Sequence, residues 1–211
     1  MATGATTFDP SKTGWCLQAR ATRSRVSVAT GLAAVMVLGL ALVAAGCTSG
    51  KPGTTHRNYF VHGADAQAFA RSVRSNAPRA GRAFGLVEIT FHPDFTLVPK
   101  DRGCRAQVRD VDLELVITLP KWRSGKSVPA GVKRRWTRFR QTITRHEDTH
   151  VRIARSYAKR MAKAIAATRS NKDCRDLSRK IKTRIAKIKV DHLKAHARFD
   201  RRERKRLKTL L

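Results

Sequence analysis

Two histidines and a glutamate in the second half of the chain have the types and spacing needed to bind a metal ion and hydrolyse a bond. Residues 146–150 read His-Glu-Asp-Thr-His. Because histidines four positions apart lie on one face of a helix, the imidazoles of His146 and His150 can both reach one Zn²⁺ ion. Glu147 follows the first of them and can act as the general base on a zinc-activated water.

The surrounding sequence predicts that this motif lies inside a long helix that begins near Ala130. Apolar side chains recur there at helical spacing, and His146 and His150 fall in phase with them. The apolar stripe consists of Trp136, Phe139, Ile143, Ile153, Tyr157 and Met161. We therefore expect both histidines to face the interior. The alternative is a pair of core histidines that are satisfied by backbone acceptors.

A zinc site of this kind needs a third protein ligand, and the residues directly after His150 include no acid or histidine. Asp200 and His196 are the main candidates, because they step by four with His192 along the predicted last helix. Further candidates in the same region are Asp173, Asp176, Asp191, His192 and Glu203. For His192 and His196, an ordinary buried histidine is the alternative.

The elements that must position these residues predict an α+β domain. Strands are expected at 59–61, 83–91 and 104–119, and the last of these alternates between apolar and polar residues until Pro120 ends it. A short helix is expected at 64–76, and a last long helix from Cys174. The expected fold is a small antiparallel sheet packed against two long helices, with a zincin-like motif on the first long helix.

The N-terminal region has the pattern of an export signal. Residues 31–45 form an apolar run of 15, which is short for a membrane-spanning helix of roughly 20 residues. Arginines precede the run, and Ala44-Ala45-Gly46-Cys47 follows it as in a bacterial lipobox, where Cys47 would carry the lipid. We expect a signal peptide at 1–46, a tether at 47–57, the domain at 58–200 and a basic tail at 201–211. An uncleaved anchor helix is the alternative, and both place the domain outside the cytoplasm on a membrane.

The cysteines then allow one pairing. Cys16 lies in the signal segment and Cys47 is assigned to lipid, which leaves Cys104 and Cys174. In an oxidising compartment these two are expected to form a disulfide. Two free buried thiols are the alternative.

The chain is strongly basic, with a formal net charge of +30. Residues 1–46 hold four of its 45 basic and one of its 15 acidic residues, so the remainder carries +27. Such a charge attracts polyanions, including lipid headgroups and wall polymers of the cell envelope. Nucleic acid is a less favoured partner, because no nucleic-acid-binding motif accompanies the charge. A generally basic protein composition is the alternative explanation.

Short motifs lie in a definite order between residues 58 and 200. They are Tyr59-Phe60-Val61-His62-Gly63, Cys104, Thr118-Leu119-Pro120, Trp122, Trp136, His146-Glu147-x-x-His150, Cys174 and Phe199-Asp200. This order resembles the bacterial domain of unknown function 922 family, described as secreted and zinc-protease-like. The resemblance implies a metallopeptidase whose substrates are not established.

The end of the chain departs from that family pattern. Members often carry Tyr-Asp followed by Thr-x-His-Gly, whereas here Phe199-Asp200 is followed by Glu203, Lys205 and Arg206. If the family's third ligand is the late histidine, this chain lacks it, and Asp200 or His196 is left to complete the site.

Together these features predict a lipid-anchored zinc metallopeptidase of the cell envelope that cleaves a peptide or protein substrate. His146 and His150 would bind Zn²⁺ with Asp200 or His196, and Glu147 would be the general base. The alternative is a non-catalytic, basic, envelope-binding lipoprotein with a degenerate or structural zinc site.

Overall fold

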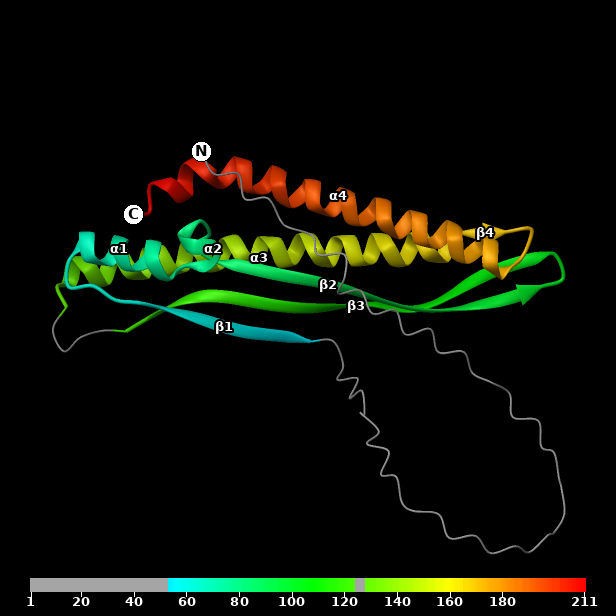
Figure 1. Ribbon diagram of the computed structural model, residues 1–211, viewed down its shortest axis with the longest axis horizontal. Helices are drawn as coiled ribbons and strands as arrows, with labels where there is room; N and C mark the ends of the chain where they lie inside the picture. The colour runs from blue at the N-terminus through cyan, green and yellow to red at the C-terminus, as the bar shows by residue number, and fades with distance from the viewer. Residues whose placement is uncertain (1–52, 124–127) are drawn as a thin grey trace, which may run out of the picture. The chain divides into compact units, whose positions relative to one another are not determined.

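The computed structural model describes residues 53–123 and 128–211, in which a β-sheet packs against two long helices. The strands are β1 (Thr54–Val61), β2 (Leu86–Lys100), β3 (Gly103–Trp122) and β4 (Arg169–Ser170). The helices are α1 (Ala66–Asn76), α2 (Pro78–Gly81), α3 (Ala130–Ala167) and α4 (Cys174–Lys208). Figure 1 shows α3 lying along the sheet and α4 running back along α3. The α+β class and the two long helices are confirmed.

The sheet is mixed, which corrects the prediction of an antiparallel sheet. Its order is β1-β3-β2, and β4 pairs with the start of β3. β2 and β3 are antiparallel, whereas β1 runs parallel to β3, with Thr54 opposite Leu115 and Val61 opposite Trp122. Alternation in a sequence shows which side chains share a face but not the direction of the neighbouring strand. The long connection through α1 and β2 allows the parallel pairing.

Two strands run past the ends that the sequence predicted, residue 91 for the first and Pro120 for the second, and both contain prolines. β2 extends to Lys100 and includes Pro93 and Pro99, which it tolerates because it is an edge strand. Pro120 lies within β3 and does not end it. The pairing of β2 with β3 reaches only to Thr118, so at Pro120 only β1 lies beside β3 and one backbone N–H is not needed.

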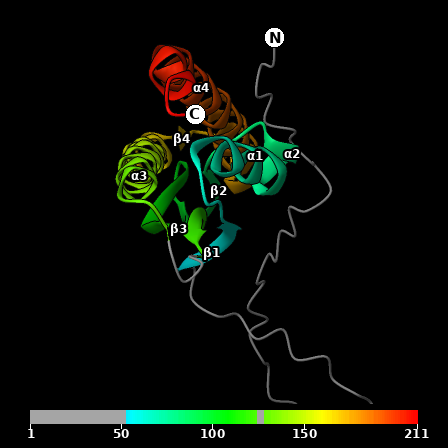
Figure 2. The ribbon, with the colours of Figure 1, turned by 90° about the vertical axis from the view of Figure 1, so that its left-hand side faces the viewer.

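The fold extends beyond residues 58–200 at both ends. β1 begins at Thr54, inside the segment expected to be a tether, and α4 continues to Lys208, inside the expected basic tail. The apolar residues of that tail explain the extension, because Leu207, Leu210 and Leu211 pack on the cluster around Phe69. Figure 2 shows this end of the molecule, where α1, the start of α3 and the end of α4 come together.

The predicted signal segment, with its apolar run and Cys47, lies outside the described residues. Within 53–123 and 128–211, no helix is both long enough and apolar enough to cross a bilayer.

Two apolar clusters hold α3 and α4 and leave a polar stretch between them. The first joins α1, β1 and the early part of α3, and includes Phe69, Val73, Phe139, Ile143 and Leu210. The second joins the late part of α3 to the early part of α4, and includes Met161, Ile165, Leu177, Ile181 and Ile185. The His-Glu-x-x-His motif at 146–150 falls between the two clusters along α3, so packing on both sides fixes the helix that carries it.

A disulfide joins Cys104 in β3 to Cys174, the first residue of α4, as the cysteine count predicted. Their Cα atoms are 5.0 Å apart and 70 residues separate them in the chain. By loop-closure entropy a bond of this span stabilises the fold by about 4 kcal/mol. It also fixes the start of α4 to the sheet, and so sets the point from which α4 runs back to Asp200.

Candidate metal centre

α3 brings the three motif residues to one buried patch. His146, Glu147 and His150 are 6%, 4% and 8% exposed. The Nε2 atoms of His146 and His150 lie 3.1 Å apart. Both imidazoles therefore point at one position, as the four-residue spacing predicts.

α4 adds Asp200 to this pair. Its Oδ1 lies 3.0 Å from Nε2 of His150 and 3.3 Å from Nε2 of His146. Among the described residues, these three form a group whose ligand atoms are close enough to hold a metal ion. The ring of the preceding residue, Phe199, stacks on His146 at 4.7 Å between centroids and meets His150 edge-on. The aromatic contacts thus fix the α4 turn that presents Asp200.

The spacing of the three ligand atoms fits a zinc-sized ion. Ligands at about 2.0–2.1 Å around a tetrahedral centre lie about 3.3 Å from one another. The three distances here, 3.0, 3.1 and 3.3 Å, agree with that value. Two imidazole nitrogens and one carboxylate oxygen are also a ligand set found in catalytic zinc sites. The Asp200 side chain is 49% exposed, so the cluster can be reached by solvent from that side.

The charge of Asp200 suits a ligand. Burial alone would raise its pKa, but hydrogen bonds with the His146 and His150 imidazoles outweigh this effect and hold the pKa of the carboxyl well below its ordinary value. Asp200 is therefore ionised at neutral pH, as a metal ligand must be.

Glu147 lies beside the cluster in an environment that suits a general base. Burial raises the pKa of this carboxyl to about 7, although the neighbouring His150 and His146 lower it in part. A group that titrates near the working pH can both accept and return a proton. The general-base role that the sequence suggested for Glu147 stays a prediction, and a carboxyl with this pKa has the property that the role requires.

The backbone before β2 holds the Glu147 side chain in place. A Cβ atom at Gly85 would overlap Glu147 Oε1 and lie 2.8 Å from Ile143 Cγ2. The Tyr59 hydroxyl donates a 2.6 Å hydrogen bond to the Phe84 carbonyl, which fixes this segment. Burial is the main cause of the raised pKa of Tyr59, and the charge of Glu147 adds to it. Neither Tyr59 nor Gly85 was predicted from the sequence to be a site residue. A glycine within a predicted strand was the available signal, because it often marks a close approach.

On the sequence-based hypothesis that Glu147 is the general base for a zinc-bound water, replacing Gly85 by Ala is expected to lower the catalysed rate about 100-fold. The added methyl group pushes Glu147 out of place, and misplacement by about 1 Å can cost that much. Zinc affinity should be unchanged, since no metal ligand moves. Kinetics and a zinc titration on the same preparation would test both statements. Gly131, around which no atom lies within 4 Å of an added Cβ, provides the matched control as Gly131→Ala. An unchanged rate in Gly85→Ala would contradict this role for the segment.

The structure separates the two candidates for the third ligand. Asp200 faces the histidine pair, whereas His196 lies behind His150, with the two Nδ1 atoms 2.5 Å apart. His192 follows, its Nε2 2.7 Å from Nε2 of His196. Burial lowers the pKa of His196 to about 3 and that of His192 to about 4, so both rings are neutral at pH 7.

The remaining candidate ligands form helix caps, hydrogen bonds or ion pairs with other residues. Asp173 caps the start of α4, Asp176 accepts from Ser170 and Lys180, and Asp191 pairs with Arg160. Glu203 pairs with Arg206, and its Oε2 lies 3.9 Å from Nδ1 of His146. That nitrogen is buried and has no hydrogen-bond partner among the described residues.

The fold and site together define an α+β protein with a candidate metal centre between two antiparallel helices. A family model described as "Bacterial protein of unknown function (DUF922)" matches residues 56–206, and the chain belongs to this family. The resemblance seen in the sequence is therefore confirmed. Searches of the curated proteins and of the solved structures returned no match. The description of this family assigns no function to its members.

Proposed function

We propose that this protein is a zinc-dependent hydrolase of the cell envelope and that it cleaves peptide bonds. The observation that carries the proposal is the convergence of His146, His150 and Asp200 on one position, with Glu147 buried beside them. A purely structural zinc site uses four protein ligands, whereas this cluster offers three and is accessible at Asp200. That difference favours the catalytic proposal over a structural site.

Each residue of the site would have a separate role in peptide hydrolysis. His146, His150 and Asp200 would hold the ion, which when bound polarises the scissile carbonyl and lowers the pKa of a water. Glu147 takes a proton from the attacking water while the oxygen of that water bonds to the carbonyl carbon. The same carboxyl then returns the proton to the amide nitrogen as the carbon–nitrogen bond breaks. The Phe84–Gly85 segment keeps Glu147 directed at the site.

The proposed location is outside the cytoplasm, on a membrane, through a lipid on Cys47. The Cys104–Cys174 disulfide supports an oxidising compartment. The apolar run at 31–45 and the small residues before Cys47 support export and lipidation.

Metal removal tests the proposed activity. The full chain, purified in detergent, is expected to contain stoichiometric zinc and to cleave members of a random peptide library. A chelator should abolish cleavage and added zinc should restore it, because without the ion Glu147 has no activated water to deprotonate. Cleavage that survives complete zinc removal, or a protein without zinc and without activity, would overturn the proposal.

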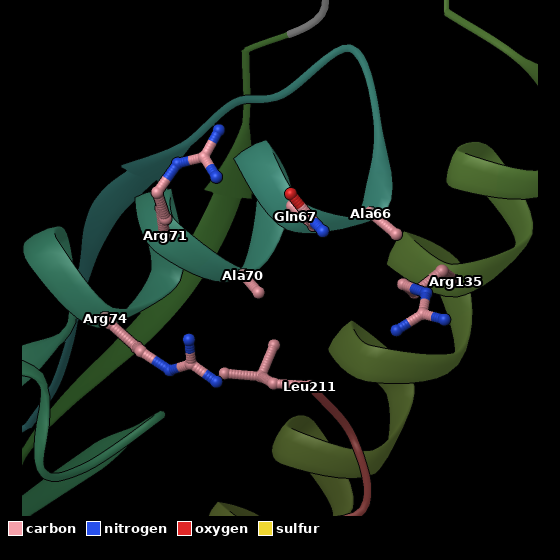
Figure 3. Close-up of a pocket in the computed structure, with 7 residues that line it drawn as sticks. All are labelled: Ala66, Gln67, Ala70, Arg71, Arg74, Arg135 and Leu211. Carbon is pink, nitrogen blue, oxygen red and sulfur yellow. The ribbon is translucent and has the colours of Figure 1, made fainter.

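A second candidate function, binding of an anionic envelope polymer, is favoured by an arginine-lined cavity. The cavity, of about 340 Å³, lies between α1 and the start of α3, and Arg71, Arg74 and Arg135 line it. Figure 3 shows Arg74 extending from α1 toward Leu211, with Arg135 across the hollow on α3. None of the three forms an ion pair within residues 53–123 and 128–211. Three arginines that line one hollow, without an ion pair among the described residues, suit phosphate, which arginine binds in bidentate fashion.

Replacing the three arginines by Gln should weaken binding of a fluorescent polyphosphate at physiological salt by at least about tenfold, or ~1.4 kcal/mol. The control triple variant Arg175→Gln, Arg184→Gln and Arg204→Gln removes the same charge from exposed positions on α4. It should bind nearly as well as wild type. Equal weakening in both variants would show that total charge, and not this cavity, binds the polymer.

A further inference from the structure

Behind the metal cluster, three imidazoles form a continuous row that leads away from it. His150 presents Nε2 to the cluster and Nδ1 to His196. His196 in turn presents Nε2 to His192, which is 5% exposed. Phe91 and Tyr157 meet the His192 ring edge-on, with centroids at 5.0 and 5.3 Å. The row therefore ends in a packed aromatic environment that fixes its last member.

The contact between His150 and His196 is an in-plane hydrogen bond and not a ring stack. The two ring planes differ by 5° and their centroids are 4.7 Å apart. The centroid separation equals about the Nδ1–Nδ1 distance of 2.5 Å plus, for each ring, the distance from its centroid to its Nδ1 atom. The two nitrogens therefore face each other along the line that joins the rings. At that distance one nitrogen must carry the proton and the other must offer its lone pair.

Metal binding decides which nitrogen carries the proton. A metal on Nε2 of His150 uses that lone pair, so the proton of the neutral ring must be on Nδ1, and His196 Nδ1 must accept it. The His196 proton then lies on Nε2 and points at His192 Nε2, which accepts. Each of the two hydrogen bonds, from His150 to His196 and from His196 to His192, then has one donor and one acceptor.

We propose that His196 is a positioning residue which accepts the Nδ1–H of His150, and that His192 holds His196 in the tautomer able to do so. The inference rests on the proposed metal site. The partner that orients a metal-binding histidine is usually a carboxylate, a carbonyl or a water. Here a neutral imidazole takes that place. Because it does not add negative charge, the row fixes the His150 ring without making the ligand more anionic.

Two replacements of His196 separate this role from others. In His196→Asn, the amide oxygen can accept at the position of Nδ1, whereas His196→Leu fills space without an acceptor. We expect His196→Leu to weaken zinc binding by about 10- to 100-fold, and His196→Asn to keep wild-type affinity. Were His196 itself a zinc ligand, His196→Asn would be as impaired as His196→Leu, and that result would overturn the proposal. So would unchanged affinity in His196→Leu.

A spectroscopic measurement completes the test. In zinc-loaded wild type and His196→Asn, proton NMR should show a protected His150 Nδ1–H signal, which His196→Leu should lack. His192→Phe keeps the aromatic packing but removes the second acceptor, and a several-fold loss of zinc affinity is expected. Unchanged affinity would overturn the role assigned to His192. A wild type that binds no zinc would instead refute the proposed function, so the two failures are distinguishable.

Discussion

Replacing Glu147 by Gln is expected to lower peptide hydrolysis by about 100- to 10,000-fold, the range that a positioned general base contributes. The amide has the shape of the carboxyl and can keep the position of the side chain beside Gly85. It cannot take up the proton from water. Zinc content should therefore stay at the wild-type level while kcat/KM falls. Kinetics on the best substrate from the peptide library, with metal analysis of the same samples, would measure both.

Glu88→Gln is the matched control for this variant. Glu88 is exposed on β2 and pairs with Arg57, away from the cluster. It should retain full activity. A Glu147→Gln variant as active as wild type would exclude Glu147 as the base. Loss of zinc together with loss of activity would show that Glu147 supports the site and does not act as its base.

Replacing Asp200 by Ala is expected to weaken zinc binding by more than about 100-fold, because even partners that only orient a ligand typically contribute 10- to 100-fold. Asp200 Oδ1 lies within 3.3 Å of both histidine Nε2 atoms and carries the negative charge of the cluster. Without it, only the imidazoles of His146 and His150 remain as ligands. Competition with a chromophoric chelator would measure the change in affinity.

Asp191→Ala is the control for this replacement, because Asp191 lies on the same helix but pairs with Arg160. Its zinc affinity should equal that of wild type. If Asp200→Ala bound zinc as tightly as wild type, Asp200 would not be a ligand, and the His146–His150 pair would need a different partner.

The local part of the site could be predicted from the sequence. The helical period between Trp136 and Met161 placed His146 and His150 on the buried face, and all three motif residues are indeed buried. A single helix determines their relative positions, so no tertiary information is needed. The disulfide could also be predicted from the sequence, because the cysteine count left Cys104 and Cys174 as the one possible pair.

The sequence reduced the candidates for the third metal ligand to a few residues near the end of the chain, but it did not identify which of them is the ligand. His192, His196 and Asp200 lie on one face of α4, and the sequence does not determine which of them sits opposite His150. That choice depends on how α4 is aligned along α3. The disulfide at Cys174 and the two apolar clusters set this alignment.

Long-range features were the least predictable. The parallel pairing of β1 with β3 depends on a chain path that alternation does not encode. Gly85 and Tyr59 act through backbone contacts with residues far along the chain, so their types alone gave little indication of a role. The packing of Leu207, Leu210 and Leu211 was hidden by the many basic residues around them.

The coordination of bound zinc tests the central claim most directly. X-ray absorption on the zinc-loaded full chain is expected to show two imidazole nitrogens and two oxygens, at about 2.0–2.2 Å. One oxygen belongs to Asp200 and the other to water. In Asp200→Ala the oxygen shell should lose the carboxylate. A first shell with three imidazoles, or with four protein ligands and no water, would contradict an open, catalytic metal centre built from His146, His150 and Asp200.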